Sequence, residues 1–219
     1  GNAKDNQHDE IIGKLPSNAI NQVILNCGKN EKKSLNTFVN YLLTKSKDNG
    51  FDSFSNAYIV FKWICTNIEF DMEGSRSGNA ACTSEDSFNN GKTTILGFVN
   101  LYKDILEKMG IEATIVNGFT KSQKNSPDEL KVPKHFWVLI KIEDKKYIVD
   151  IFWGAGFVME NKWVKEFTDY YFCPNPKEFI LTHFPEVKEG ENISDLTLLP
   201  ENNGICNNLQ EFGELVLIK

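Results

Sequence analysis

The stretch Gly91–Met109, GKTTILGFVNLYKDILEKM, decides the fold of this chain. Its apolar residues recur at spacings of three and four, the period of one buried face of an α-helix. They are Ile95, Phe98, Val99, Tyr102, Ile105, Leu106 and Met109. Thr93 or Thr94 can cap the start of this helix, and Gly110 can end it. The pattern therefore predicts one amphipathic helix with a small, polar entrance.

The entrance of this helix is a setting in which enzymes hold a nucleophile. Free backbone N–H groups and the positive end of the helix dipole stabilise an anion there. The residue at the first buried turn is Ile95, whose hydrocarbon side chain has no nucleophilic atom. The sequence thus shows the setting of a reactive site without the reactive atom.

Composition narrows the class of protein. The chain has 219 residues, of which 41% are hydrophobic and 25% charged, as expected for one globular domain with an N-terminal extension. The net charge of -6 argues against nucleic acid or an anionic membrane as the main partner, because both require clustered Lys and Arg. No apolar run reaches the roughly 18 residues that membrane insertion requires. The expected partner is a protein or peptide, and the oligomeric state is left open.

The cysteines and histidines do not form a metal-binding or disulfide pattern. An odd number of cysteines occurs at irregular distances and without a CxxC pair, at Cys27, Cys65, Cys82, Cys173 and Cys206. With only three histidines, neither a metal-centred mechanism nor a cofactor is expected. Unpaired cysteines favour an intracellular, reducing environment. Secretion stays open, because the chain begins at Gly1 and not at Met.

The predicted elements are helices in the first half and strands in the second. Helical periodicity covers residues 15–28, 35–44 and 54–68, and a stretch rich in Ser, Asn, Gly and Asp at 71–90 predicts a loop. Alternating patterns then predict strands at 111–119, 136–142 and 147–152, a polar insertion at 121–132, and an edge or closing strand at 215–218.

His135 and Asp150 are the residues with the greatest potential for chemistry. His135 begins one predicted strand and Asp150 ends the next. If Glu143-Asp144 forms a two-residue turn, Trp137 lies opposite Asp150, and His135 is a diagonal neighbour on the same face, within reach of the carboxylate. A turn at Asp144-Lys145 would move His135 too far away. A carboxylate bonded to one imidazole nitrogen fixes the tautomer that lets the other act as a base, although a buried polar pair without catalysis shows the same pattern.

Four segments together resemble the transglutaminase-like superfamily of cysteine enzymes, in the branch that contains kyphoscoliosis peptidase, hillarin and the fungal cytokinesis proteins. They are FKWICTNIEFD (61–71), GKTTILGFVNLYKDILEKMGIEATIVNGF (91–119), HFWVLIKIEDKKYIVDIFWGAG (135–156) and DYYFCPNPKEFILTHFPE (169–186). The resemblance implies an α+β fold with a papain-like core, in which the central helix packs on an antiparallel sheet. We expect a flexible segment 1–14, because the chain begins with polar residues, and a single domain 15–219, composed of N-terminal helices 15–68, a catalytic-type core 69–156 and a C-terminal extension 157–219.

The resemblance also assigns roles to residues. The family motif before the central helix is lysine, glycine, valine, cysteine, any residue, glycine, aromatic; on residues 92–98 its lysine, second glycine and aromatic match, while the cysteine falls on Ile95. His135 and Asp150 match the family's histidine and aspartate. The chain thus has two members of the triad without the thiol that attacks a carbonyl in acyl transfer.

The sequence therefore predicts a catalytically inactive domain that binds proteins or serves as a scaffold. Its cleft would be lined by Ile95, Trp137 and Trp153, with His135 at the edge. The alternative is an active peptidase or transglutaminase in which Cys82, on the preceding loop, supplies the nucleophile. A third hypothesis is a structural role without a ligand.

Two residues outside this cleft are expected to have structural roles. Cys65 is expected to pack as a small apolar group in the helix at 54–68. His183 is expected to end a helix or to pack beside Phe184. Neither is predicted to take part in chemistry.

Overall fold

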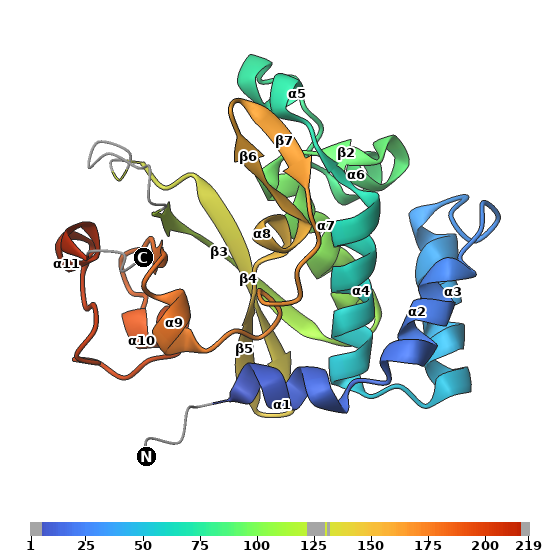
Figure 1. Cartoon of the computed structure of the whole chain (residues 1–219), viewed down its shortest axis with the longest axis horizontal. Helices are drawn as coiled ribbons and strands as arrows, with labels where there is room; N and C mark the ends of the chain where they lie inside the picture. The colour runs from blue at the N-terminus through green and yellow to red at the C-terminus, as the bar shows by residue number, and fades with distance from the viewer. Residues whose placement is uncertain (1–5, 122–129, 131, 216–219) are drawn as a thin grey trace.

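A four-stranded antiparallel sheet lies at the centre of the molecule, with helices on both faces (Figure 1). The computed structural model describes residues 6–121, 130 and 132–215. The strand order is β5 (Lys145–Val149), β4 (His135–Ile142), β3 (Glu112–Thr120) and β8 (His183–Pro185). Two smaller sheets are the parallel pair β1 (Glu69–Phe70) and β2 (Lys92–Thr93) and the antiparallel hairpin β6 (Gly156–Met159) and β7 (Lys162–Lys165).

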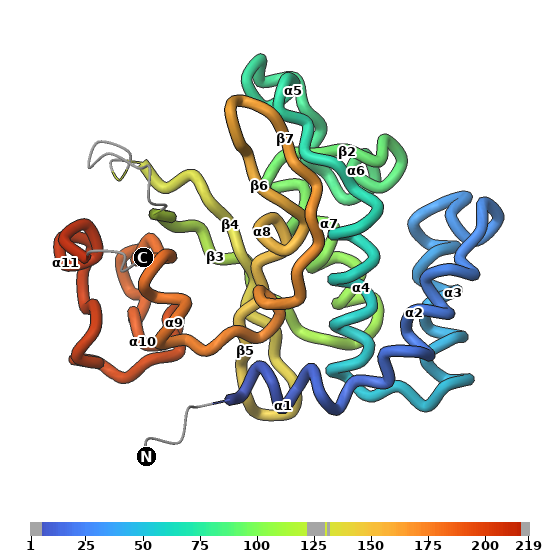
Figure 2. Tube along the Cα trace, viewed as in Figure 1, coloured from blue at the N-terminus to red at the C-terminus, as the bar shows by residue number. Residues whose placement is uncertain are grey.

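Helices from the first half of the chain cover one face of the sheet, and short C-terminal helices lie beyond the other, as the chain trace in Figure 2 shows. The first group is α1 (Gln7–Lys14), α2 (Ser17–Leu25), α3 (Leu35–Asn49), α4 (Ser53–Asn67), α5 (Met72–Ser77), α6 (Ser84–Asn90) and α7 (Ile95–Lys108). The second is α9 (Pro176–Phe179), α10 (Ile193–Thr197) and α11 (Leu209–Glu214), whereas the short helix α8 (Ile151–Ala155) packs with α4 and α7. The expected α+β arrangement is confirmed.

The central helix α7 begins and ends as predicted. The Thr94 hydroxyl oxygen accepts a hydrogen bond from the Gly97 N–H at 3.0 Å, and Gly110 follows the helix with a positive φ of 82°. Phe98 and Tyr102 are fully buried, and the Tyr102 hydroxyl donates to the Ala57 carbonyl of α4 at 3.0 Å. Burial of each large apolar side chain contributes roughly 1.5 to 3 kcal/mol. Packing of this face holds α7 between α4 and the sheet.

The β4–β5 hairpin has the register that brings His135 toward Asp150. Val138 pairs with Val149 and Ile142 with Lys145, so the turn is Glu143-Asp144, with Glu143 at a φ of 57°. One step farther along this register, Trp137 is opposite Asp150. The structure therefore has the first of the two turns considered from the sequence.

The structure corrects several element boundaries. The expected loop at 71–90 contains helices α5 and α6, because Asp71 and Thr83 cap their starts and Gly78 and Gly91 end them in left-handed conformations. The expected strand 147–152 ends at Val149, because Asp150 caps helix α8. The insertion at 121–132 and the strand at 215–218 lie mostly outside the described residues.

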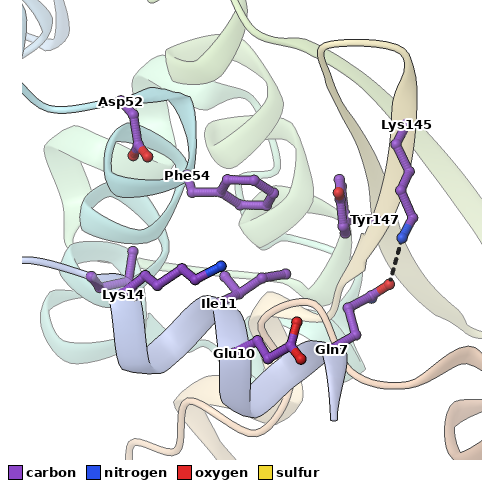
Figure 3. Close-up of a pocket in the computed structure, with 9 residues that line it drawn as sticks. Gln7, Glu10, Ile11, Lys14, Asp52, Phe54, Lys145 and Tyr147 are labelled. Carbon is purple, nitrogen blue, oxygen red and sulfur yellow. Dashed lines mark hydrogen bonds between the residues drawn. The ribbon is translucent and has the colours of Figure 1, made fainter. Parts of the chain in front are cut away.

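The segment that was expected to be flexible, residues 1–14, contains helix α1. A ring nitrogen of His8 bonds the Phe172 carbonyl at 2.8 Å. Between α1, the start of α4 and the β5 hairpin lies a pocket of about 350 Å³, where the Lys145 ammonium donates to the Gln7 side chain and the Phe54 and Tyr147 rings meet edge to face (Figure 3). Helix α1 is thus attached to the end of the sheet that lies farthest from His135. None of the helices among the described residues has the length and apolar character to span a lipid bilayer.

Candidate functional site

Asp150 lies where a strand ends and a helix begins. One carboxylate oxygen, Oδ1, accepts a hydrogen bond from the Trp153 N–H at 2.9 Å and so caps α8. Its own backbone N–H donates to the Tyr171 carbonyl at 3.0 Å. The side chain has no solvent exposure. Asp150 therefore connects β5, α8 and the segment around Tyr171.

Two histidines share the second carboxylate oxygen of Asp150. His135 Nε2 lies 2.6 Å from Oδ2, and His183 Nε2 lies 2.8 Å from the same atom. An ionised carboxylate only accepts hydrogen bonds, so each Nε2 carries its proton and donates it. In neutral His135 the Nδ1 atom is then an acceptor, as a catalytic base in this position would require.

The chain environment explains the charge state of the cluster. Burial alone would raise the pKa of the Asp150 carboxyl, but the His135 charge and the hydrogen bonds from His135 and His183 outweigh it and hold that pKa below its usual range. Burial lowers the pKa of His183 to about 4, although the hydrogen bond and charge of Asp150 act in the opposite direction. At neutral pH the cluster therefore contains a carboxylate and a neutral His183.

The spacing of the cluster fits hydrogen bonding better than metal coordination. His135, Asp150 and His183 together offer three potential metal-ligating atoms within 4.8 Å of one another. Two ligands of a tetrahedral zinc ion, each about 2.0 to 2.1 Å from the metal, stand roughly 3.3 Å apart. The two N–O distances of 2.6 and 2.8 Å are shorter than this and match charge-assisted hydrogen bonds.

Aromatic rings enclose the two imidazoles. The His183 ring stacks on Phe179 with centroids 3.7 Å apart, and the Trp153 ring lies 4.4 Å from His183 and 5.7 Å from His135. Trp137 meets His183 edge to face at 5.4 Å but is only 1% exposed. The expectation that Trp137 lines an open cleft is therefore not met, because its indole is packed against Phe179 and His183; Trp153 and Ile95 are partly exposed.

Ile95 is the first residue of α7 and is partly exposed. Residues three positions apart on an α-helix are about 60° apart around its axis, so Ile95 and Phe98 share a face. The Phe98 ring lies 5.8 Å from the Phe152 ring, which in turn lies 5.9 Å from the His135 ring. The position that the family motif gives to cysteine thus shares a helix face with Phe98, which is connected to His135 through the Phe152 ring.

The hydroxyl groups beside Ile95 already have structural partners. The Thr94 oxygen caps α7, and the Thr93 hydroxyl donates to the Ala81 carbonyl at 2.8 Å while Ser87 bonds the same hydroxyl at 2.7 Å. These bonds attach the entrance of α7 to the segment before it. Neither threonine is a ready replacement for a nucleophile.

Cys82 lies along a different side of α7. Its carbonyl accepts a hydrogen bond from the Asn100 amide at 2.7 Å. Asn100 follows Phe98 by two residues, which is about 200° around the helix axis, so it points away from the face that Phe98 presents to Phe152. The backbone of Cys82 is thus held at Asn100, on a different side of α7 from Phe98.

The structure confirms the structural role that was expected for Cys65 but not the one expected for His183. Cys65 is fully buried and its thiol donates to the Ile151 carbonyl at 3.3 Å; burial raises its pKa well above the ordinary value, as expected for a structural thiol. The role of His183 in the cluster was missed. It was expected to end a helix or to pack beside Phe184, but it begins a strand that pairs with β3 and bonds Asp150; the signal was its place in the family-like segment 169–186.

A hollow of about 370 Å³ opens on the outer side of Trp153. Its walls come from α8, β6 and the segment that follows β7, and are formed by Trp153, Gly156, Phe157, Glu166, Thr168 and Tyr171. Three of these side chains are aromatic and one is a carboxylate. The Trp153 ring therefore separates the buried histidine cluster from an accessible apolar surface.

Comparisons with known proteins agree with this architecture. Residues 38–151 match the model of the transglutaminase-like superfamily. Kyphoscoliosis peptidase of Mus musculus is 26% identical over 72% of this chain and 24% of its own length, and that of Homo sapiens is 26% identical over 59% and 20%. The chain thus spans about a quarter or less of these curated relatives. A solved structure, described as "Crystal structure of a TGase", has 15% identity and a TM-score of 0.44, and covers 70% of this chain and 39% of that chain.

Proposed function

Because the chain belongs to the transglutaminase-like superfamily, in the branch of kyphoscoliosis peptidase, we propose that it is a catalytically inactive member that binds other proteins. The observation that carries this proposal is Ile95, which begins α7 at the position that the family motif gives to cysteine, in a chain that keeps the His135–Asp150 hydrogen bond. Acyl transfer in a cysteine enzyme begins with attack by a thiolate, and a hydrocarbon side chain cannot form the covalent intermediate.

The surroundings of Ile95 support the loss of catalysis. The adjacent hydroxyls of Thr93 and Thr94 are engaged in bonds that hold the entrance of α7. Cys82 is held to Asn100 on another side of the helix. Without a nucleophile, a triad retains only the rate enhancement that binding and oxyanion stabilisation provide.

The surface outside Trp153 supports protein binding as the remaining function. Ordinary surfaces of monomeric proteins expose single apolar side chains, whereas aromatic residues around a hollow are typical of interaction sites. Here Trp153, Phe157 and Tyr171 surround a hollow whose one charged residue is Glu166. We expect a protein segment to occupy it. A scaffold without a ligand is the second candidate.

Reactivity of the thiols tests the inactive state. The wild type, Ile95→Cys and Cys82→Ala would be labelled with iodoacetamide at neutral pH, mapped by mass spectrometry, and assayed for peptide hydrolysis and for incorporation of a fluorescent amine into casein. We expect no turnover by the wild type or by Cys82→Ala. We expect the thiol introduced at position 95 to react fastest, and His135→Gln in the same background to slow it. Turnover by the wild type that disappears in Cys82→Ala would establish the alternative enzyme.

Capture of partners tests the binding role. Phe157 is 42% exposed at the hollow, and Val187 is 40% exposed elsewhere on the surface. Affinity capture with wild type, Phe157→Ser and Val187→Ser would be compared by quantitative mass spectrometry. Proteins retained by wild type and by Val187→Ser but lost with Phe157→Ser would support the hollow as the binding site. Equal retention by all three variants would favour a scaffold that does not use this surface.

A further inference from the structure

Strand β6 has an unusual exposed surface. Phe157, Val158 and Met159 follow one another along it and are 42%, 47% and 50% exposed. No charged residue lies between Gly156 and Met159. The hairpin of β6 and β7 projects from the molecule above α8, apart from the four-stranded sheet (Figure 1). A run of three exposed apolar residues on a short strand needs an explanation.

The free edge of β6 also presents unused backbone groups. Met159 pairs with Lys162 across the Glu160-Asn161 turn, and the ladder continues to the bond from the Glu166 N–H to the Ala155 carbonyl. Bonded pairs alternate along an antiparallel hairpin, so the N–H and C=O of Val158 point away from β7. Within the part of the chain that the structure describes, β6 has β7 as its one strand partner.

Other strand edges near the site are covered. The Lys165 ammonium of β7 donates to the Ile68 carbonyl, and the Trp163 indole donates to the Glu69 carboxylate. The outer edge of β5 is bridged by the Cys173 N–H, which donates to the Ile148 carbonyl. Proteins usually protect an exposed edge with charges, proline or a covering segment, because unpaired backbone groups recruit another strand. Among the residues that the structure describes, none of these protections is found along β6.

We propose that β6 is a docking edge for an extended segment of a partner protein, which adds as a strand and inserts an apolar side chain into the hollow beside Trp153. This proposal rests on the proposed binding function and names the chemistry of its partner. A residue in an added strand directly opposite Phe157 would have its Cβ about 4.5 to 5.5 Å away, so the hollow that Phe157 lines is within reach.

The negative charge near the hollow indicates the charge of the partner segment. Glu166 lies at the rim of the hollow, is exposed, and makes no ion pair with any other described residue. The whole chain has a net charge of -6. A segment with Lys or Arg next to its apolar residue therefore complements the site better than an acidic one. Strand addition gains affinity from the backbone and specificity from alternate side chains.

A synthetic strand tests the proposal. The probe is an N-acetylated, C-amidated peptide Lys-Val-Lys-Phe-Lys-Val-Lys carrying a fluorophore, and its binding is measured by anisotropy. Val158→Pro removes the outward N–H and no bond of the β6–β7 ladder, whereas Val158→Thr retains the N–H with a similar shape. We expect Val158→Pro to weaken binding at least tenfold and Val158→Thr to change it less than twofold. Glu166→Gln should weaken binding about threefold at low salt.

Two control peptides keep the test decisive if Val158→Pro fails to fold. The same sequence with an N-methyl group on every residue has no N–H between its residues to donate to a strand, and a version with Glu in place of Lys has the opposite charge. Binding of the N-methylated peptide as tight as the parent would overturn strand addition, and so would unchanged affinity of a folded Val158→Pro.

Self-association and catalysis are read out separately. A concentration-dependent dimer in sedimentation that is lost in Val158→Pro, without peptide binding, would show that β6 pairs with a second copy and would overturn the partner segment. Absence of peptide binding with no enzymatic turnover would overturn this inference and leave the loss of catalysis standing. Turnover by the wild type with strand binding intact would overturn the inactive state alone.

Discussion

Replacement of His183 by Gln should reduce the acid sensitivity of the fold. Gln keeps an amide N–H that can donate to Asp150 Oδ2, where His183 Nε2 lies at 2.8 Å, but it does not titrate. In the folded protein the pKa of His183 is lowered from its ordinary value of 6.5 to about 4, chiefly by burial. Between these values the unfolded chain binds the proton and the folded protein does not, so stability falls as the pH falls through this range.

The pKa difference sets the size of this effect. A shift from 6.5 to about 4 corresponds to roughly 3 kcal/mol of unfolding free energy when the whole range is crossed. Between pH 7 and pH 4.5 the share of His183 is about 2 kcal/mol. Below pH 4 this contribution becomes constant, and protonation of Asp150 takes over, because its pKa is held below the usual range and its stabilisation is lost at still lower pH.

Urea unfolding at pH 7 and pH 4.5 measures the difference. Wild type should lose about 2 kcal/mol more than His183→Gln over this interval, after each protein is compared with itself at pH 7. Tryptophan fluorescence reports the transition, since Trp153 contacts the cluster. Equal losses for the two proteins, within about 0.5 kcal/mol, would show that His183 does not hold its depressed pKa in the folded state and would refute this account of the cluster.

Three further predictions concern folding. Asp150→Ala leaves two buried imidazoles without their acceptor and should cost about 3 to 5 kcal/mol in urea unfolding, and a loss below 1 kcal/mol would contradict the shared carboxylate. Gly97→Ala should destabilise the protein, because a Cβ there would stand 1.7 Å from the Thr93 hydroxyl oxygen, whereas Gly13→Ala has nothing within 4 Å and should be neutral or stabilising by thermal melting. Thr94→Val removes the cap of α7 and should cost about 1 kcal/mol, while Thr94→Ser should cost much less.

Local patterns in the sequence predict the central helix and several of the strands. The spacing of apolar residues located α7, and a two-residue turn at Glu143-Asp144 gave the register that brings His135 to Asp150. Periodicity is sufficient to predict α7 from neighbours in sequence, whereas the sequence left two turns open, and the structure has the one that brings His135 to Asp150. The short helices α5 and α6 had signals as well, since Asp71 and Thr83 are typical N-caps, but their polar composition resembled that of a loop.

The second histidine could not be predicted in the same way. His183 reaches Asp150 across 33 residues and through the pairing of β8 with β3. A three-residue strand has no periodicity to detect, and the side of the sheet that it joins depends on the packing of the C-terminal segment. The burial of Trp137 has the same origin, because Phe179 covers its ring from that segment.

Asp150 has consequences for how activity is inferred from sequence in this superfamily. Its carboxylate caps the start of α8, and its N–H donates to the Tyr171 carbonyl. The same carboxylate accepts hydrogen bonds from the two buried imidazoles of His135 and His183. These hydrogen bonds stabilise the fold, so a stable domain would require Asp150 even without catalysis. An intact acid–imidazole pair in a relative of this chain is therefore poor evidence of activity, and the atom at the head of the central helix is the diagnostic one.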